Sequence, residues 1–334
     1  MKKNRYLVLG LVFGLILIGV AYALTLIKTP SPSSQPTPSP STVAPAISGT
    51  QNTTITPQVF SQKLIYWVKT GQINNIYAYD GAKKQLLFTD GNEKQKVLTF
   101  SNLSSSNPSL LALTSTSQLV SIGNLYRISM NGQGNMVQIA KDFATIEPPL
   151  PIISPNNLKI AYVIFSNAEI DYGYSLYTMS TDGTNKRKIA SEPDGIFSPV
   201  WSPDSQAIVY IKGVQGNGSF IKRVNLSSQK SATSLYETSQ PIINLVWLSA
   251  NQLAFSTQSK AKNQIYTVYS ININKGSKPQ ILDSQIPAIE FLLSNKQDII
   301  YLSANHDVFK YNILNKQTEQ IKLENVQKLL GWLP

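Results

Sequence analysis

From residue 60 onward, the hydrophobic positions occur in short runs separated by turn residues, with no amphipathic helical period. One run in each unit is apolar on both faces and does not alternate with polar residues. Its six copies are 64–68, 110–113, 160–165, 207–211, 253–255 and 299–302. Such a strand must be covered on both sides, and a sheet packed between two neighbouring sheets provides that cover.

A second run, an apolar residue next to an aromatic residue or a close substitute, follows each dense run. Its copies are Ile76-Tyr77, Leu125-Tyr126, Leu176-Tyr177, Phe220-Ile221, Ile265-Tyr266 and Val308-Phe309, at spacings of 49, 51, 44, 45 and 43 residues. Each copy leads into a turn rich in Asp, Asn and Gly, which is a hairpin signal, and a further short strand follows.

Several units begin with one more strand and a turn, and in two of them the turn contains Pro, as in Val200-Trp201-Ser202-Pro203-Asp204 and the weaker Ile153-Ser154-Pro155-Asn156. Four strands in about 45 residues is the size of a propeller blade. The sequence therefore predicts an all-β fold, a six-bladed β-propeller with four-stranded blades. The first unit lacks its first strand, and the tail Gly331-Trp332-Leu333-Pro334 resembles the start of a unit. We expect this C-terminal strand to complete the first blade and close the ring.

The N-terminal region predicts a membrane anchor. Residues 6–27 carry no charge, and as a helix they would cover about 33 Å, enough for a bilayer core. Basic residues precede the segment, which favours a cytoplasmic N-terminus. We expect a cytoplasmic tail at 1–5, a transmembrane signal anchor at 6–27, and localisation at the plasma membrane with the propeller outside the cytoplasm. The alternative is a signal peptide cleaved after Ala23, which would give a secreted protein.

Residues 28–59 are rich in Pro, Ser and Thr and have too little apolar surface to fold. They predict a disordered, semi-rigid linker that is followed by the propeller domain at 60–334.

The run Ser198-Pro199-Val200-Trp201-Ser202-Pro203-Asp204 and the weaker copy Ser154-Pro155-Asn156 resemble the repeat of the TolB-type, WD-like propeller family. The resemblance covers roughly 62–334. It implies a bacterial envelope context and binding of a protein or small ligand at one face of the ring. The chain is expected to differ from soluble periplasmic TolB in its membrane anchor and in lacking the separate α/β domain before the propeller.

The composition limits the kinds of partner and of catalytic or metal site that we expect. The net charge is +11, but no basic helix or basic-aromatic stripe occurs, so we expect no nucleic acid partner. The chain has no cysteine and one histidine, His306, which leaves no Cys nucleophile and no recognisable Ser-His-Asp arrangement. The Asp-Gly pairs lack the acidic spacing of calcium loops. We therefore expect no catalytic residue, no metal site and no cofactor.

The loops between the dense strand and the aromatic strand are the expected binding face, at the entrance to the central channel, because binding residues often lie on loops of a rigid scaffold. The candidate residues there are Glu169, Asp171, Tyr172, Tyr174, Lys260, Lys262, His306 and Asp307.

The sequence is consistent with three functions. The first is a membrane-tethered, non-enzymatic module that binds an envelope protein or another ligand. The second is a module that binds cell-wall or surface glycan. The third is a hydrolase or lyase that uses carboxylates from different blades.

Overall fold

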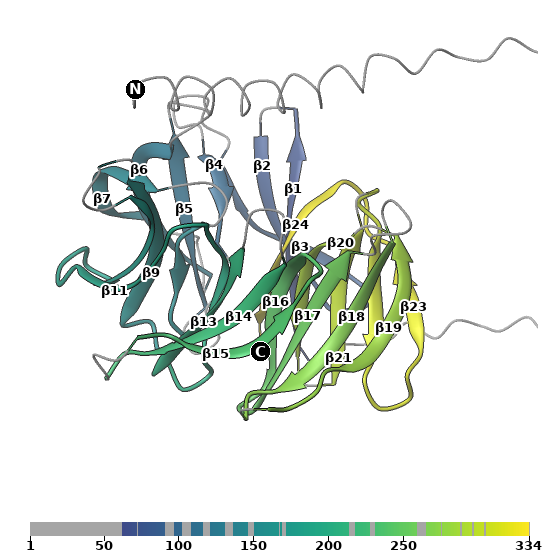
Figure 1. Ribbon diagram of the computed structural model, residues 1–334. Coiled ribbons are helices and arrows are strands. Elements are labelled where there is room, and N and C mark those ends of the chain that lie inside the picture. Colours follow the sequence, from purple (N-terminus) through teal and green to yellow (C-terminus); the bar gives the residue numbers. More distant parts are fainter. Residues whose placement is uncertain are drawn as a thin grey trace, which may run out of the picture. The chain divides into compact units, whose positions relative to one another are not determined.

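The computed structural model describes residues 62–333, except for 72, 91–96, 102–107, 116–120, 131–135, 146–149, 167, 169–171, 214–217, 228–230, 259–264, 275, 288, 296 and 304. All regular structure in these residues is β-strand (Figure 1). None of the described residues forms a helix capable of crossing a bilayer. The expected tail, anchor and linker at 1–59 lie outside them.

The strands form six four-stranded antiparallel sheets, the blades. Blade 1 holds β24 (Val326–Leu333), β1 (Lys63–Thr70), β2 (Ile73–Tyr79) and β3 (Lys84–Thr89). Blade 2 holds β4 (Val97–Phe100), β5 (Ser109–Ser115), β6 (Ser121–Ser129) and β7 (Met136–Thr145). Blade 3 holds β8 (Ile152–Ile153), β9 (Lys159–Ser166), β10 (Gly173–Ser180) and β11 (Arg187–Glu192).

The other three blades follow in chain order. Blade 4 holds β12 (Ile196–Trp201), β13 (Ala207–Gly213), β14 (Ser219–Asn225) and β15 (Thr233–Thr238). Blade 5 holds β16 (Ile242–Ser249), β17 (Gln252–Gln258), β18 (Ile265–Asn272) and β19 (Gln280–Pro287). Blade 6 holds β20 (Ile289–Ser294), β21 (Asp298–Ser303), β22 (Val308–Asn312) and β23 (Thr318–Ile321). The predicted six-bladed propeller is confirmed.

The predicted ring closure is also confirmed. β24 pairs with β1 in antiparallel register, from Lys63 opposite Leu333 to Val68 opposite Val326. On the blade 2 side, the ammonium of Lys328 donates a hydrogen bond of 2.7 Å to the carbonyl oxygen of Phe100. The C-terminal strand is therefore the first strand of a blade whose other three strands come from the start of the domain.

The hydrophobic core consists of six clusters, one between each pair of neighbouring blades. The second strand of each blade contributes to both clusters beside it: Ala161 and Val163 face blade 4, whereas Ile160 and Tyr162 face blade 2. This explains why the dense runs do not alternate with polar residues. Each is covered by a neighbouring sheet on both sides.

Strand direction divides the connections between two faces of the ring. The connections from first to second strand and from third to fourth strand lie on one face, together with the start of β1 and the end of β24. We call this the turn face. The connections from second to third strand, and from one blade to the next, lie on the opposite face, which we call the loop face. The predicted binding loops belong to the loop face.

The Ser-Pro-Asp and Ser-Pro-Asn sequences form the turns that their composition predicted. The hydroxyl of Ser202 donates to Asp204, and it also accepts a hydrogen bond of 2.9 Å from the amide of Ala207. Ser205 closes this turn with φ of 61°. Its hydroxyl also accepts a hydrogen bond from the amide of Asn156, in the equivalent turn of blade 3. These turns therefore link neighbouring blades as well as neighbouring strands.

The cross-strand register corrects two copies of the predicted repeat. Aromatic residues opposite one another on the second and third strands stack in four blades, as Tyr66–Tyr77, Tyr162–Tyr177, Phe255–Tyr269 and Tyr301–Phe309. In blade 5 the repeat pair is therefore Val268-Tyr269, and the assignment to Ile265-Tyr266 was wrong. In blade 4 the residue opposite Tyr210 is Lys222, so the pair is Ile221-Lys222, and the assignment to Phe220-Ile221 was wrong.

Candidate binding site between blades 3 and 4

The candidate site starts from a row of side chains across blade 3. Tyr174 in β10 pairs with Phe165 in β9 on one side and with Glu192 in β11 on the other. Residues directly opposite one another in antiparallel strands project from the same side of the sheet. The row faces blade 4, because Tyr174 packs on the hydrophobic cluster between these two blades.

Phe165 and Tyr174 also belong to a series of four aromatic rings that contact one another on the loop face. The Tyr172 ring contacts Phe165 edge-on at a centroid distance of 5.7 Å, Phe165 lies 5.0 Å from Tyr174, and Tyr174 lies 6.2 Å from Phe197 of blade 4. Tyr172 is 58% exposed, and Phe165 and Phe197 are also exposed. We call these four residues the aromatic row. It brings together three large exposed hydrophobic side chains, which makes it a candidate interaction surface.

Two glycines, Gly195 and Gly213, lie against the Phe197 ring. A Cβ atom at Gly213 would lie 2.8 Å from this ring, and one at Gly195 would lie 2.4 Å from it. Gly195 also has φ of 148°, whereas Gly213 has no such backbone requirement. The position of Phe197 in the aromatic row therefore depends on two residues without side chains.

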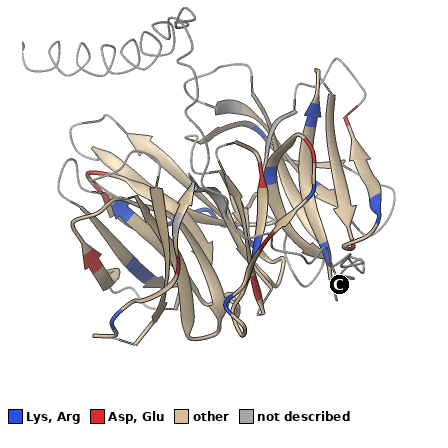
Figure 2. Ribbon diagram, turned by 90° about the vertical axis from the view of Figure 1, so that its right-hand side faces the viewer, with Lys and Arg blue, Asp and Glu red and all other residues tan. Residues whose placement is uncertain are grey.

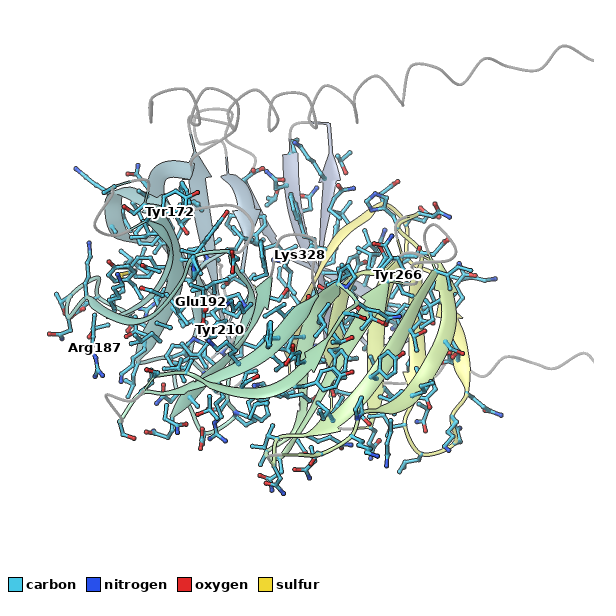
Figure 3. All side chains as sticks on the ribbon, in the orientation of Figure 1. Tyr172, Arg187, Glu192, Tyr210, Tyr266 and Lys328 are labelled. Carbon is cyan, nitrogen blue, oxygen red and sulfur yellow. The ribbon has the colours of Figure 1, made fainter. Side chains whose placement is uncertain are left out.

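A charged cluster lies beside the aromatic row, because Glu192 is directly opposite Tyr174 in the register of β10 and β11. Figure 3 labels Glu192 and Tyr210 of this cluster. The side chain of Glu192 is buried, and its Oε1 accepts hydrogen bonds from the Tyr210 hydroxyl at 2.7 Å and the Lys222 ammonium at 2.6 Å. The ammonium of Lys212 lies 3.4 Å from Glu192 and 3.8 Å from Asp194. Two carboxylates and two ammonium groups balance, which a partly buried cluster requires.

The cluster arises where blade 4 departs from the repeat. Lys222 occupies the position that is aromatic in the other blades, and its partner Glu192 ends the last strand of blade 3. Burial, together with the hydrogen bond to Glu192 and the charge of that residue, raises the pKa of Tyr210. The phenol therefore stays protonated and acts as a donor. Burial, with a smaller effect of neighbouring Tyr172, also raises the pKa of Tyr174.

The structure describes four of the eight predicted site residues. Glu169, Asp171, Lys260 and Lys262 lie outside the described residues, so their role stays a prediction. Tyr172 and Tyr174 are brought together in the aromatic row.

His306 and Asp307 lie apart from this row, in the β21–β22 loop of blade 6. The His306 Nδ1 lies 2.6 Å from the carbonyl oxygen of Val326, and Asp307 accepts a hydrogen bond from Gln320. Both therefore make contacts that support the loop, and neither is near blades 3 and 4.

Sequence reasoning missed Phe165 and Phe197, which form half of the aromatic row, and also Glu192 and Lys222. Phe165 lies at the end of a dense apolar run, where core residues were expected, and no pattern singled out Phe197. A signal was present for Lys222, because a lysine within a β-rich run breaks the repeat. Its correct alignment requires the strand register, which the sequence alone did not supply.

No group of three or more His, Asp or Glu side chains in the described part of the chain is arranged to hold a metal ion. A cavity of about 330 Å³ lies on the outer strands of blade 6, lined by Lys310, Asn312, Asn315, Gln317, Thr318 and Glu319. Three of its polar groups are engaged within the blade: Lys310 pairs with Glu319 at 2.7 Å, and Asn312 donates to Asp298. The aromatic row is therefore the stronger candidate site.

Comparison with known proteins agrees with this architecture. The chain is 35% identical over 63 residues to the Tol-Pal system protein TolB of Blochmanniella floridana, and 40% identical over 53 residues to that of Acinetobacter baylyi. These matches cover 19% and 16% of this chain, and they span only 14% and 12% of the relatives. No family model matches the chain.

Solved structures extend the likeness to the whole ring. The structure assigned to TolB from Agrobacterium tumefaciens matches with a TM-score of 0.59 at 15% identity, over 82% of this chain and 93% of that one. The propeller is TolB-like. TolB from Acinetobacter baumannii gives the same TM-score of 0.59 at 15% identity, over 83% of this chain and 68% of that one.

The TolB-like fold is also shared with an enzyme. An oligogalacturonate lyase in complex with manganese matches with a TM-score of 0.52 at 12% identity, over 74% of this chain and 70% of that one. Identities this low show the fold alone, and function must be argued from the site.

Proposed function

We propose that this protein is a binding module of the cell envelope, tethered to the plasma membrane by residues 6–27, which captures a protein partner at the aromatic row between blades 3 and 4. The single observation that carries the proposal is the contact chain Tyr172–Phe165–Tyr174–Phe197 on the loop face, in which three of the four rings are exposed. Aromatic side chains dominate the binding energy of protein interfaces because they bury large areas at low entropic cost.

The polar groups beside the row support a protein partner over a flat apolar ligand. Lys212 and Asp194 lie at the edge of the row and are partly exposed, so they can form the polar rim that surrounds an interface core. The curated relatives are named as components of the Tol-Pal system, which supports a role in an envelope assembly. We infer from the sequence that the propeller lies outside the cytoplasm.

Glycan binding is the competing function, because sugars also stack on exposed aromatic rings. The rings of the row meet at interplanar angles of 78°, 54° and 46°, so they do not form a flat platform. This geometry suits irregular side chains of a protein better than an extended sugar chain. The carboxylate enzyme is the weaker alternative, since Glu192 and Asp194 are both held by lysines.

The test is site-specific photo-crosslinking of the full-length protein in living cells. A photoreactive phenylalanine analogue replaces Tyr172 in one variant and Ile281, on the outer strand β19, in the control. The two side chains are 58% and 64% exposed. We expect a reproducible protein adduct from position 172 and none from position 281. The purified partner should then bind the full chain and lose most of its affinity with Phe197→Ser.

Three results would contradict the proposal. Equal adducts from both positions would mean non-specific contact. Glycan fragments without protein at position 172 would favour wall binding. An identified partner whose affinity is unchanged by Phe197→Ser would place its site elsewhere on the molecule.

A further inference from the structure

Among the described residues, the two faces of the propeller carry opposite net charge. We consider the connections of each face and the two strand residues next to each connection, counting described side chains only. On the turn face there are nine basic residues: Lys63, Lys83, Lys84, Lys159, Lys186, Arg187, Lys188, Lys278 and Lys316. There are five acidic residues: Asp80, Asp182, Asp204, Asp298 and Glu319. Every one of the nine basic side chains is exposed.

The loop face shows the reverse balance. By the same definition it has three basic residues, Lys69, Lys212 and Lys322. It has six acidic residues, Asp90, Glu192, Asp194, Glu237, Asp307 and Glu324. The basic and acidic positions of the domain are visible in Figure 2, and Figure 3 shows Tyr172 and Arg187 at opposite ends of blade 3.

Several acidic groups of the turn face are occupied within the fold, which leaves the basic excess directed outward. Asp298 is buried and accepts a hydrogen bond from Asn312, and Glu319 pairs with Lys310. Asp182 accepts hydrogen bonds from the amide and hydroxyl of Thr184, which lowers the pKa of this carboxyl group. Lys212, Lys222 and Lys310, which form salt bridges within the fold, are not among the nine.

Two leucines at turn tips accompany the basic residues. Leu158, in the β8–β9 turn, is 64% exposed, and Leu314, in the β22–β23 turn, is 79% exposed. They come from blades 3 and 6, which lie opposite one another in a six-membered ring. The nine basic residues come from blades 1, 3, 5 and 6. A flat, extended surface could meet all of these groups together, whereas a small ligand could not.

We propose that the turn face docks on an anionic phospholipid surface. Exposed basic residues are attracted to anionic headgroups, and apolar tips can enter the headgroup region. The position of Lys63 supports this choice of occupant, because the described chain enters the propeller on the turn face. The uncharged segment 6–27 lies about 35 residues earlier in the sequence. A linker of this length keeps the face at a high effective concentration near the bilayer.

This docking gives the acidic, aromatic loop face a defined direction. With the turn face on the lipid, the aromatic row points away from the bilayer. The inference rests on the proposed tether, which gives the turn face its high effective concentration near the bilayer. It does not depend on the proposed partner.

The absence of cysteine allows a direct test with the full chain, since any introduced thiol is unique. Leu314→Cys and Glu324→Cys carry an environment-sensitive fluorophore at opposite ends of β23, one on each face. The labelled proteins are reconstituted in vesicles of phosphatidylcholine alone, or of phosphatidylcholine with about a third phosphatidylglycerol. We expect the Leu314→Cys signal to rise in the anionic vesicles only and to be lost at about 0.5 M salt. The Glu324→Cys signal should stay unchanged.

Charge variants with equal net change make the test specific. Lys186→Glu with Arg187→Glu should lower the docking equilibrium constant by about 25-fold or more, at roughly fivefold for each charge removed. Lys69→Glu with Lys322→Glu, on the loop face, should leave it unchanged.

The possible contrary outcomes are distinguishable. A protein that does not enter the vesicles contradicts the tether in the proposed function. A tethered protein with equal signals in both vesicle types, or from both labels, overturns the docking inference. A Leu314→Cys response to soluble polyphosphate, with none to anionic vesicles, would replace the lipid by an anionic polymer.

Discussion

The hydroxyl of Tyr210 donates a 2.7 Å hydrogen bond to the carboxylate of Glu192, and this contact joins the second strand of blade 4 to the last strand of blade 3. Tyr210 is completely buried, and Glu192 also holds Lys222. The aromatic row therefore rests on a polar contact between blades as well as on hydrophobic packing.

Tyr210→Phe tests how much that hydrogen bond contributes to the stability of the fold. The variant removes one hydrogen bond to a charged acceptor and preserves the ring, so we expect a loss of about 1.5–3 kcal/mol in the free energy of unfolding. Denaturant unfolding measures it. Tyr162→Phe is the matched control, because Tyr162 is also buried and stacks on Tyr177. Its hydroxyl has no hydrogen bond within the described residues, so we expect a change below about 0.5 kcal/mol. Equal losses in both variants would refute the assigned role of the Tyr210 hydroxyl.

Ring closure through β24 makes a second prediction. Leu329 packs between blades 6 and 1, and Leu330 packs between blades 1 and 2, both fully buried. Either Leu→Ala change should lower the free energy of unfolding by about 2–5 kcal/mol, because it leaves a cavity at a closure interface. Leu314→Ala removes the same atoms from an exposed turn and should change it by less than about 0.5 kcal/mol. The closure argument fails if all three variants unfold at the same denaturant concentration.

The sequence alone was enough to predict the architecture, because each strand and turn of the repeat has its own characteristic residue types. Dense apolar runs, hairpin turns and the Trp-containing tail predicted six blades and their closure, and strand pairing confirmed them. It was not sufficient for β4 (Val97–Phe100), whose connection to β5 spans residues 101–108 and contains neither the Ser-Pro-Asp sequence of blade 4 nor the Ser-Pro-Asn sequence of blade 3. It was also insufficient for the register of blades 4 and 5. Side chains alternate along a strand, so a shift of one or three residues reassigns the inward positions.

The candidate site was harder to predict because its parts are distant along the chain. Tyr172 and Tyr174 were identifiable as aromatic residues beside an acidic loop. Phe197 joins them only because Gly195 and Gly213 leave room for its ring, and no local pattern shows that two glycines will face one phenylalanine. Contacts between blades thus determine the site, whereas local patterns determine the blades.

Gly213→Ala tests whether the Phe197 position matters for binding. The added methyl would lie 2.8 Å from the ring, too close for contact, so the ring must move. The backbone at this residue needs no positive φ, and we expect the variant to fold. The crosslinking yield from position 172 should fall, and a crystal structure should show the ring displaced. Gly276→Ala is a control in open space, although its φ of 83° adds local strain. Unchanged crosslinking in Gly213→Ala would remove Phe197 from the binding surface.

Alkaline pH should weaken the fold through its buried tyrosines. Burial, with smaller effects of Tyr77 and Tyr79, raises the pKa of Tyr66 to about 12. Burial and Asp283 likewise raise the pKa of Tyr301. Such groups hold protons more tightly in the folded state than in the unfolded state. Their contribution is complete below about pH 10 and is lost as pH rises through the folded-state pKa. Denaturant unfolding at pH 8 and at about pH 11, with tyrosinate absorbance followed in parallel, measures this loss.

Tyr66→Phe identifies the group responsible. This variant removes one tyrosine that favours the protonated form, so the loss of stability between the two pH values should become smaller than in the wild-type protein. Leu314→Ala, which removes no titratable group from an exposed turn, should leave the loss unchanged. All other titratable groups are the same in the three proteins, so their effect cancels in the comparison. An identical pH dependence in Tyr66→Phe and the wild-type protein would show that Tyr66 does not titrate differently in the folded and unfolded states.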